Sequence, residues 1–321
     1  MSAGHVSENL HPAPRTLQRL LLAGPTAVGK SAVALALVER LGGEIISVDS
    51  MQVYRGLDLG TAKPSPAERA GVPHYLIDVV ELTEPFDAAK FVTLARRAEA
   101  DIRARGKVPI FCGGTGLYFK AYLEGLGESP AADATLRAEL EATPLAELLR
   151  ELEQRDPATF AQIDRANPRR VVRALEVIRL TGRPFSEQRA GWNAEPGARN
   201  AEKIFALQRE PADLRARIGA RVDEMFRRGL VDETRALLAR GLDQNRTAMQ
   251  AIGYRQIVEH IRGERDLAWT IALVKTKTWQ FARRQMTWFR GQLSAKWLLV
   301  TPVEETQAVA ERITALCLGS R

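Results

Sequence analysis

Short apolar runs alternate with stretches of helical spacing from about residue 17 to residue 125. The run Leu20–Ala23 ends at a glycine, and apolar residues then recur every three or four positions over 31–41, the spacing of an amphipathic helix. Strands that alternate with helices predict a parallel sheet with crossover helices, and ligands bind at the carboxyl ends of such strands. The other predicted elements of this part are strands over 44–49, 75–80 and 108–112 and a helix over 88–105.

After about residue 126 the alternation stops and helical spacing dominates. A helix is predicted over 135–155 with a break at Pro144. Asn167 and Gly182 have the positions of an N-cap and a C-terminal glycine for the next helix. The later segments are predicted as a polar loop over 186–203, helices over 211–228, 231–240, about 248–262 and 266–290, and a strand over 297–300.

This order of elements predicts an α/β fold whose core is interrupted by a helical insertion. The core, a parallel sheet flanked by helices, comprises 17–125 and about 203–321, and its second part is mostly helical. The insertion, about 126–202, is expected to be all-α, and residues 1–16 are expected to form a flexible tail.

Composition narrows the classes of function. The 321 residues include 46 Lys and Arg against 39 Asp and Glu, a net charge of +7, which is compatible with a nucleic-acid partner without requiring one. The cysteines, Cys112 and Cys317, are too few for a disulfide scaffold or a four-ligand zinc site. No apolar run approaches the roughly 20 residues of a membrane span, and the polar N-terminus lacks the apolar centre of a signal peptide. We therefore expect a cytoplasmic protein.

One motif indicates specific chemistry. Residues 24–31, GPTAVGKS, follow an apolar strand and match the phosphate-binding loop (P-loop) pattern G-x-x-x-x-G-K-[ST]. Glycines let main-chain N–H groups point at a phosphate, and the following helix N-terminus adds positive potential. The lysine is expected to contact phosphate oxygens and the serine hydroxyl to bind Mg²⁺. The predicted binding residues are Gly24, Pro25, Thr26, Ala27, Val28, Gly29, Lys30 and Ser31.

The loop alone predicts a polyphosphate ligand without specifying which one, and a chance match in a chain rich in glycine and alanine is the alternative. A nucleoside triphosphatase or small-molecule kinase is one class that fits. Such an enzyme needs an acid at the end of an apolar strand to hold its metal, and Asp49 and Asp78 both have that position.

Five further motifs follow in order: DSMQVYRGLDLGTAKP at 49–64, GGTGLY at 113–118, NPRRVVRALE at 167–176, AIGYR at 251–255 and RQMTWFR at 284–290. With them the chain resembles the bacterial tRNA dimethylallyltransferases over about residues 20–300. That family transfers a dimethylallyl group from its diphosphate to the exocyclic amine of the adenosine immediately 3′ of the anticodon. The resemblance implies that the loop binds dimethylallyl diphosphate rather than ATP, with Mg²⁺ as cofactor. It also implies that the insertion grips the anticodon stem-loop of tRNA, and we expect a monomer.

The resemblance assigns catalytic roles to Thr26, Lys30, Asp49 and Thr115. Lys30 and the loop amides are expected to stabilise the departing diphosphate. Asp49, beside the loop, is expected to accept the proton that the amine loses. Other interpretations stay open: Asp49 in the second coordination shell of Mg²⁺ or as a helix cap, and Thr115 as a cap of the next helix.

Basic residues at helical spacing predict an RNA surface. Arg169 and Arg173 are four apart and therefore on one helix face, and Arg284 precedes Trp288 by four on the long helix. Cations with aromatic neighbours suit phosphate contact and base stacking; the alternative is a solvated face whose aromatic residues lie in the core. By motif position, the predicted RNA contacts are Asp49, Ser50, Met51, Gln52, Thr115, Arg137, Arg169, Arg170, Arg173, Gln250, Gly253, Tyr254, Arg255, Arg283, Arg284, Gln285, Thr287, Trp288 and Arg290.

Two other functions remain possible from the sequence. The chain could be a prenyltransferase that acts on free adenine nucleotides, or a P-loop small-molecule kinase. The basic helical half disfavours the first of these, because a mononucleotide needs no such surface. Trp279 and Phe281 are core candidates, and Tyr54 and Tyr118 are expected to pack either on the prenyl chain or in the core.

Overall fold

The computed structural model describes residues 17–127, 130, 133–188 and 203–318. The predicted tail and most of the loop predicted over 186–203 lie outside these ranges. The chain divides into two compact units, Met1–Lys120 with Arg199–Arg321, and Ala121–Ala198, each with its own hydrophobic core. None of the helices in the described ranges combines the length and the apolar character needed to cross a membrane.

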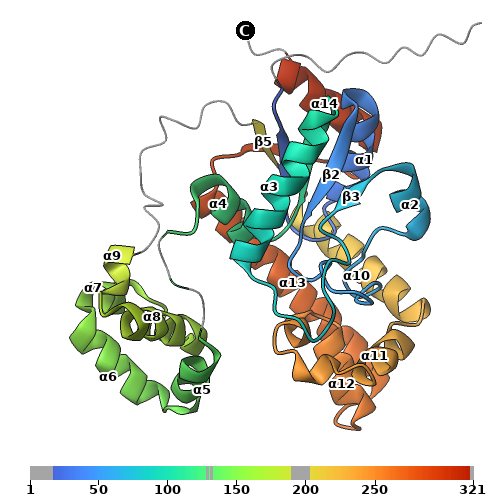
Figure 1. Ribbon diagram of the computed structural model, residues 1–321. Coiled ribbons are helices and arrows are strands. Elements are labelled where there is room, and N and C mark those ends of the chain that lie inside the picture. Colours follow the sequence, from blue (N-terminus) through green and yellow to red (C-terminus); the bar gives the residue numbers. More distant parts are fainter. Residues whose placement is uncertain (1–16, 128–129, 131–132, 189–202, 319–321) are drawn as a thin grey trace, which may run out of the picture. The chain divides into compact units, whose positions relative to one another are not determined.

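A six-stranded parallel sheet forms the centre of the larger unit (Figure 1). Its strand order is β3-β2-β4-β1-β5-β6. This confirms the predicted α/β class. All four residues of β1 are fully buried, and a strand covered on both faces is apolar along its whole length. The strands are β1 (Leu20–Ala23), β2 (Gly43–Val48), β3 (His74–Tyr75), β4 (Val108–Gly113), β5 (Lys203–Gln208) and β6 (Lys296–Leu299).

The register of the sheet brings the carboxyl ends of β1, β2 and β4 together. Ala23 and Val48 both pair with Gly113 from opposite sides. A Cβ on Gly113 would lie 2.0 Å from the Val48 carbonyl oxygen, so this close approach requires glycine. The phosphate loop, Asp49 and the turn after β4 therefore lie at one edge of the sheet.

Two strands differ from the prediction. The strand expected over 75–80 is only His74–Tyr75, because Leu76 and Asp78 have φ angles of +63° and +55°, which interrupt an extended backbone. Strand β5 is not predicted by the sequence pattern. Only four of its residues, 204–207, are apolar, too short a run to be recognised from periodicity alone.

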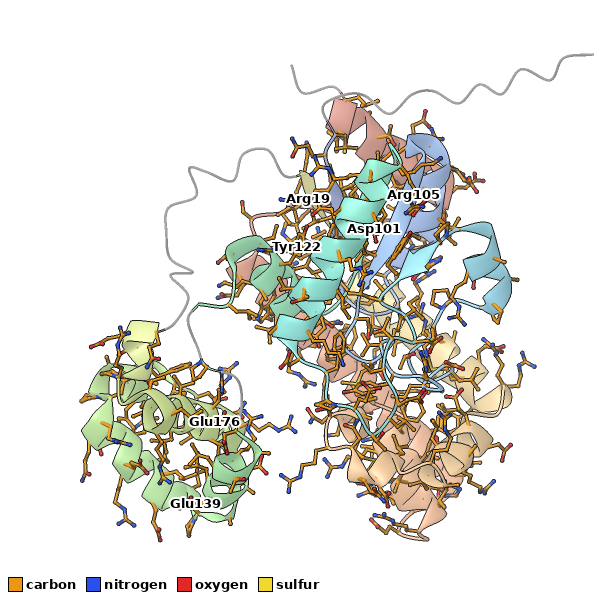
Figure 2. The ribbon with its side chains drawn as sticks, in the orientation of Figure 1. Arg19, Asp101, Arg105, Tyr122, Glu139 and Glu176 are labelled. Atoms are coloured by element: carbon orange, nitrogen blue, oxygen red, sulfur yellow. The ribbon has the colours of Figure 1, made fainter. Side chains whose placement is uncertain are left out.

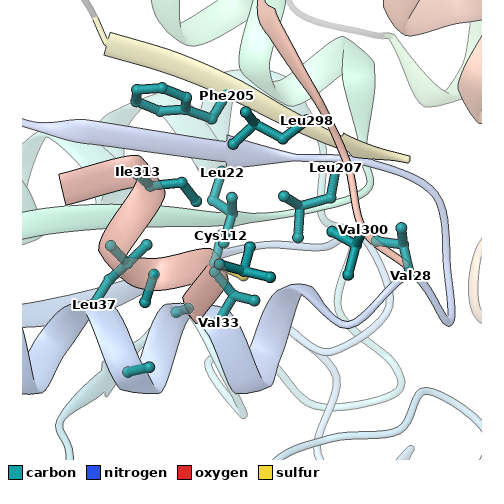
Figure 3. Packing of buried hydrophobic residues seen from close by; sticks show 14 of the residues in the cluster. Leu22, Val28, Val33, Leu37, Cys112, Phe205, Leu207, Leu298, Val300 and Ile313 are labelled. Atoms are coloured by element: carbon teal, nitrogen blue, oxygen red, sulfur yellow. The ribbon is translucent and has the colours of Figure 1, made fainter. Parts of the chain in front are cut away.

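Two helices pack together and form the main hydrophobic core with the sheet. α1 (Lys30–Leu41) contacts α14 (Thr306–Leu318), which the sequence pattern does not predict. Leu37 and Ile313 of these helices belong to the same buried cluster as Leu22 and Phe205 of the sheet (Figure 3). Outside this cluster, α3 (Ala88–Ala104) packs on β2 and β4.

The C-terminal part of the larger unit is mostly helical, as predicted. α10 (Pro211–Arg227), α11 (Leu230–Leu238) and α13 (Leu267–Gln292) begin and end within two residues of the predicted bounds. The helix expected over 248–262 is divided: Ala248–Gln250 is a 3₁₀ turn, and α12 (Tyr254–Ile261) begins after Gly253, whose φ is +105°. Further short elements are α2 (Pro66–Gly71), α4 (Gly116–Glu124) and the 3₁₀ turn Leu242–Gln244.

The smaller unit consists of helices around buried leucine and valine side chains such as Leu152 and Leu175. Its longest helix ends at Gly182 in the left-handed region, as predicted, whereas Asn167 at its start forms no side-chain capping bond. Pro144 separates two helices, also as predicted. The helices are α5 (Ala134–Ala142), α6 (Leu145–Arg155), α7 (Pro157–Gln162), α8 (Pro168–Thr181) and α9 (Phe185–Gln188).

Candidate active site and RNA-binding surface

The phosphate loop has the backbone of an anion-binding turn. It joins β1 to α1, and Gly24, Ala27 and Gly29 have φ angles of +145°, +62° and +109°. A Cβ on Gly24 would lie 2.8 Å from the carbonyl oxygen of Leu207, so the neighbouring strand β5 also requires glycine there. Positive φ values turn successive N–H groups to one side, and the N-terminus of α1 adds its dipole. The loop is therefore suited to a phosphate or diphosphate.

Lys30 stands at the start of α1 and is held by the loop itself. Its Nζ donates to the Pro25 carbonyl oxygen at 2.7 Å. The pKa of Lys30 is lowered to about 8, chiefly because burial disfavours the charged form; the nearby Arg221 contributes to the lowering, and Cys112 and Asp49 oppose it. A bound anion would favour the charged ammonium. Burial raises the pKa of the Cys112 thiol to about 11, so this cysteine is a neutral thiol and a poor nucleophile at pH 7.

Three arginines that the sequence pattern does not predict, Arg209, Arg217 and Arg221, lie near the loop. Arg209 Nε donates to the Val28 carbonyl oxygen at 2.9 Å, and Arg217 Nε donates to the Ala27 carbonyl oxygen at 3.0 Å. Burial lowers the pKa of Arg217 and of Arg221. The four-residue spacing of the last two, on one face of a predicted helix, is the signal that would have found them. Arg209 follows β5, the strand that was not predicted.

Asp49 and Thr115 lie at neighbouring strand ends, after β2 and β4. The Asp49 Oδ1 atom accepts hydrogen bonds from the N–H groups of Met51 at 2.8 Å and Gln52 at 3.2 Å. Its Oδ2 atom accepts none from the described residues. The Thr115 hydroxyl oxygen accepts from the Ser50 N–H at 3.0 Å, which ties the two strand ends together. Asp49 thus both stabilises its own turn and keeps one carboxylate oxygen available.

Asp78 does not fit the role of metal ligand that the kinase interpretation gave it. Its Oδ1 accepts from Lys63 Nζ at 2.5 Å, and its Oδ2 accepts from Arg69 Nη1 at 2.6 Å. Both oxygens are thus engaged by cations, and the prediction of Asp78 as a possible metal ligand is wrong. Among the described residues, no cluster of three or more His, Cys, Asp or Glu is placed to hold a metal.

Several predicted RNA contacts come together on α13. Arg283, Arg284, Thr287 and Trp288, with the unpredicted Gln280, line a hollow of about 470 Å³. Arg283, Arg284 and Thr287 are exposed, and the Arg284 guanidinium lies 5.9 Å from the Phe281 ring centroid. The structure thus gathers cationic and aromatic groups on one helix face.

The aromatic candidates divide between core and surface. Tyr54 is fully buried, and Tyr118 stacks on Phe91 with ring centroids 4.4 Å apart, so both belong to the core. Trp279 packs partly buried against the main hydrophobic cluster, as expected, whereas Phe281 is 37% exposed. The expectation that Phe281 is a core residue is therefore wrong.

Other predicted contacts have structural partners. Tyr254 is fully buried, where its hydroxyl donates to Glu233 Oε1 at 2.6 Å and accepts from the Gly60 N–H. Its side chain is therefore not available for an RNA contact, which corrects the prediction for this residue. The Gln52 side chain accepts from Ser47 and donates to the Thr61 carbonyl oxygen. Arg290 donates to Gln208 Oε1 at 3.1 Å, beside the ends of β5 and β6.

In the smaller unit, a buried carboxylate organises two of the predicted arginines. Glu176 is fully buried on α8 (Figure 2). Its Oε2 atom accepts from Arg137 Nη2 at 2.7 Å and from Arg173 Nη1 at 2.8 Å. Arg169 and Arg170 are exposed near the start of the same helix. All four arginines retain exposed side-chain surface in this unit, although two are anchored from within.

Known proteins resemble this chain over most of its length. The family model described as IPP transferase matches residues 52–292. The tRNA dimethylallyltransferase of Halorhodospira halophila is 50% identical over 280 residues, which cover 85% of this chain and 90% of the relative. That of Geobacillus thermodenitrificans is 44% identical and covers 94% and 96%.

Two solved structures are also similar to this chain over most of its length. The crystal structure of the tRNA isopentenylpyrophosphate transferase of Bacillus halodurans has a TM-score of 0.68 at 38% identity and covers 93% of this chain and 95% of its own. A eukaryotic dimethylallyltransferase acting on tRNA gives 0.76 at 27% identity, with 92% and 77% covered. The phosphate loop, the Asp49 turn and these matches lead to one conclusion: the chain belongs to the IPP transferase family.

Proposed function

We propose that this chain transfers a dimethylallyl group from dimethylallyl diphosphate to the exocyclic N6 amine of the tRNA adenosine immediately 3′ of the anticodon. One observation carries the proposal: the loop that holds Lys30 and the turn that holds Asp49 lie at one edge of the sheet, after β1 and β2, the two strands that flank β4. A leaving diphosphate and an acceptor amine can therefore meet between them. The names of the relatives, tRNA dimethylallyltransferase, support the same reaction.

The reaction requires stabilisation of the leaving diphosphate and removal of a proton from the acceptor amine. A bond forms between N6 and the allylic carbon, the carbon–oxygen bond breaks, and its electron pair leaves with the diphosphate. Lys30, the loop N–H groups and the arginines Arg217 and Arg221 stabilise that departing charge. The amine loses one proton, and Asp49 accepts it through the oxygen that the turn does not use.

Mg²⁺ fits the oxygen donors at the loop. Ser31 is exposed at the first turn of α1, and no hydrogen bond of its hydroxyl is found within the described ranges. Mg²⁺ usually binds through one or two protein oxygens together with phosphate oxygens and water. When bound, the metal would neutralise charge on the diphosphate. We propose Ser31 as its protein ligand.

The tRNA must present an unstacked adenine to Asp49, because an amine inside the base stack of the anticodon loop is not accessible. We propose that the exposed α13 residues Arg283, Arg284 and Thr287 bind RNA phosphates near the active site. We also propose that the insertion binds the anticodon stem-loop through Arg137, Arg169, Arg170 and Arg173. Cationic surfaces of this kind suit RNA backbone, and Trp288 suits base stacking.

The direct test is a product assay. Purified protein is incubated with dimethylallyl diphosphate, Mg²⁺ and an anticodon stem-loop that carries adenosine after the anticodon. We expect the RNA to gain the mass of one dimethylallyl group, and a matched stem-loop with guanosine at that place to gain nothing. Competition with AMP separates the two acceptors: preferential prenylation of AMP would refute tRNA as the substrate.

Arg284→Ala is expected to weaken stem-loop binding and to reduce its salt dependence. Each lost phosphate contact lowers the slope of log K against log salt by about 0.7–0.9. Stem-loop affinity measured between 50 and 200 mM salt checks this. An unchanged slope would indicate that Arg284 belongs to a solvated helix face and does not contact RNA phosphate.

Donor affinity is expected to fall as the pH rises through 8. The pKa of Lys30 is lowered to about 8 by burial, and only the ammonium form attracts a diphosphate. The affinity is therefore close to full at pH 7, about half of that at pH 8, and about tenfold weaker at pH 9 than at pH 7, the ratio of the protonated fractions. Calorimetry across this range measures it, and Lys30→Met must abolish the dependence. A pH-independent wild-type affinity would contradict the assignment.

A further inference from the structure

Gln285 joins the two halves of the proposed active site. It lies on α13 and is 8% exposed. Its Oε1 atom accepts from the Thr26 N–H of the phosphate loop at 2.9 Å, and its Nε2 atom donates to the Gly114 carbonyl oxygen at 2.9 Å. One side-chain amide thus bridges the loop after β1 and the turn after β4.

Glycines in the turn after β4 allow α13 to pack closely against it. A Cβ on Gly114 would lie 2.4 Å from Gln285 Nε2, and a Cβ on Gly116 would lie 2.1 Å from the Trp288 ring. Gln285 and Trp288 are three residues apart, so they project from one face of α13. Two glycines therefore let α13 approach the turn closely at two consecutive points.

Each end of the Gln285 bridge contacts a segment that carries a proposed reactive side chain, Lys30 at one end and Asp49 at the other. Thr26 belongs to the loop that holds Lys30. Gly114 precedes Thr115, whose hydroxyl holds the Ser50 N–H beside Asp49. The bridge consequently fixes the distance between the place of the leaving diphosphate and the place of the proton acceptor.

We propose that Gln285 is a positioning residue that sets the spacing of the donor loop and the acceptor turn, rather than an RNA contact; this inference rests on the proposed transfer reaction. Its amide is buried, and its oxygen and its nitrogen each bond to the main chain, so the side chain faces the loop and the turn. A misplacement of about 1 Å between reacting groups can cost about 10²-fold in rate. Loss of the bridge therefore affects the donor and the rate more than the RNA.

The first experiment compares Gln285→Met with Gln292→Met. Gln292 lies on the same helix and contacts Lys120, so its replacement is the matched control. Calorimetry gives the Kd of dimethylallyl diphosphate without RNA, a gel-shift titration gives the Kd of the stem-loop, and single-turnover kinetics give the rate. For Gln285→Met we expect a donor Kd raised about tenfold, a rate lowered about 10²-fold and a stem-loop Kd within about twofold of wild type. Gln292→Met should resemble wild type.

A second variant reaches the same bridge from the other side. Gly114→Ala keeps Gln285 but pushes its flexible amide away from the turn, and it should reproduce the donor and rate defects. The double variant should be no worse than either single one, because both remove the same interaction. Additive defects would overturn the proposal.

The outcomes separate this inference from the reaction itself. If wild-type protein fails to bind dimethylallyl diphosphate, the proposed function fails. If wild type binds it and Gln285→Met loses only stem-loop affinity, Gln285 is an RNA contact and the inference is overturned. If a folded Gln285→Met, checked by its thermal melt, retains donor affinity and rate, the inference is overturned as well.

Discussion

Replacement of Asp49 by asparagine is expected to lower the rate of prenyl transfer by about 10²–10⁴-fold, the usual contribution of a general base. Asparagine keeps the Oδ1 atom that accepts from Met51 and Gln52, so the turn should persist. The variant loses the basic oxygen that would receive the amine proton. Stem-loop affinity should therefore stay close to that of wild type.

Single-turnover kinetics with saturating donor and stem-loop measure this effect. Asp101→Asn is the matched control, because Asp101 is an exposed carboxylate on α3 (Figure 2), and it should leave the rate unchanged. A near-wild-type rate for Asp49→Asn would show that Asp49 is not the proton acceptor. Loss of stem-loop binding without loss of rate at saturation would assign it to RNA recognition instead.

Replacement of Lys30 by methionine is expected to have the second large effect. The Pro25 carbonyl oxygen holds the ammonium against the loop, where we propose that charge develops as the diphosphate leaves. Removal of one such preorganised donor typically costs about 10²–10³-fold in kcat. Because the ground-state diphosphate also needs this charge, the donor Kd should rise as well.

The kinetic constants for donor and stem-loop, measured separately, distinguish this effect from a general loss of structure. Lys107→Met removes an exposed lysine elsewhere on the chain and should change neither. In Lys30→Met the KM for the stem-loop should stay unchanged, whereas kcat should fall and the KM for the donor should rise. A donor Kd equal to that of wild type would contradict the placement of the diphosphate at the loop.

The phosphate loop and Asp49 are predictable from sequence because their chemistry is local. The glycines, Lys30 and Ser31 are contiguous, and an apolar strand and an amphipathic helix flank them. Asp49 directly follows a second apolar run. Parallel-sheet logic then places both at one edge, since the carboxyl ends of such strands meet there.

The residues that sequence reasoning missed or misassigned depend on tertiary contacts. Arg217 reaches the loop only because α10 packs beside it. Tyr254 and Gln285 belong to motifs that are predicted to contact RNA, yet their side chains face inward, to Glu233 and to Thr26. A motif identifies a segment, but only packing decides which of its side chains face the ligand.

The preferred ligand of the phosphate loop decides whether the chain binds a prenyl donor or a nucleoside triphosphate there. Wild-type protein with Mg²⁺ is titrated by calorimetry with dimethylallyl diphosphate and, separately, with ATP, and Lys30→Met serves as the blank for the loop. We predict saturable binding of the prenyl donor that Lys30→Met loses, with ATP unable to displace it at equal concentration. Tight binding of ATP at the loop, without detectable binding of dimethylallyl diphosphate, would contradict the proposal that the loop binds the prenyl donor.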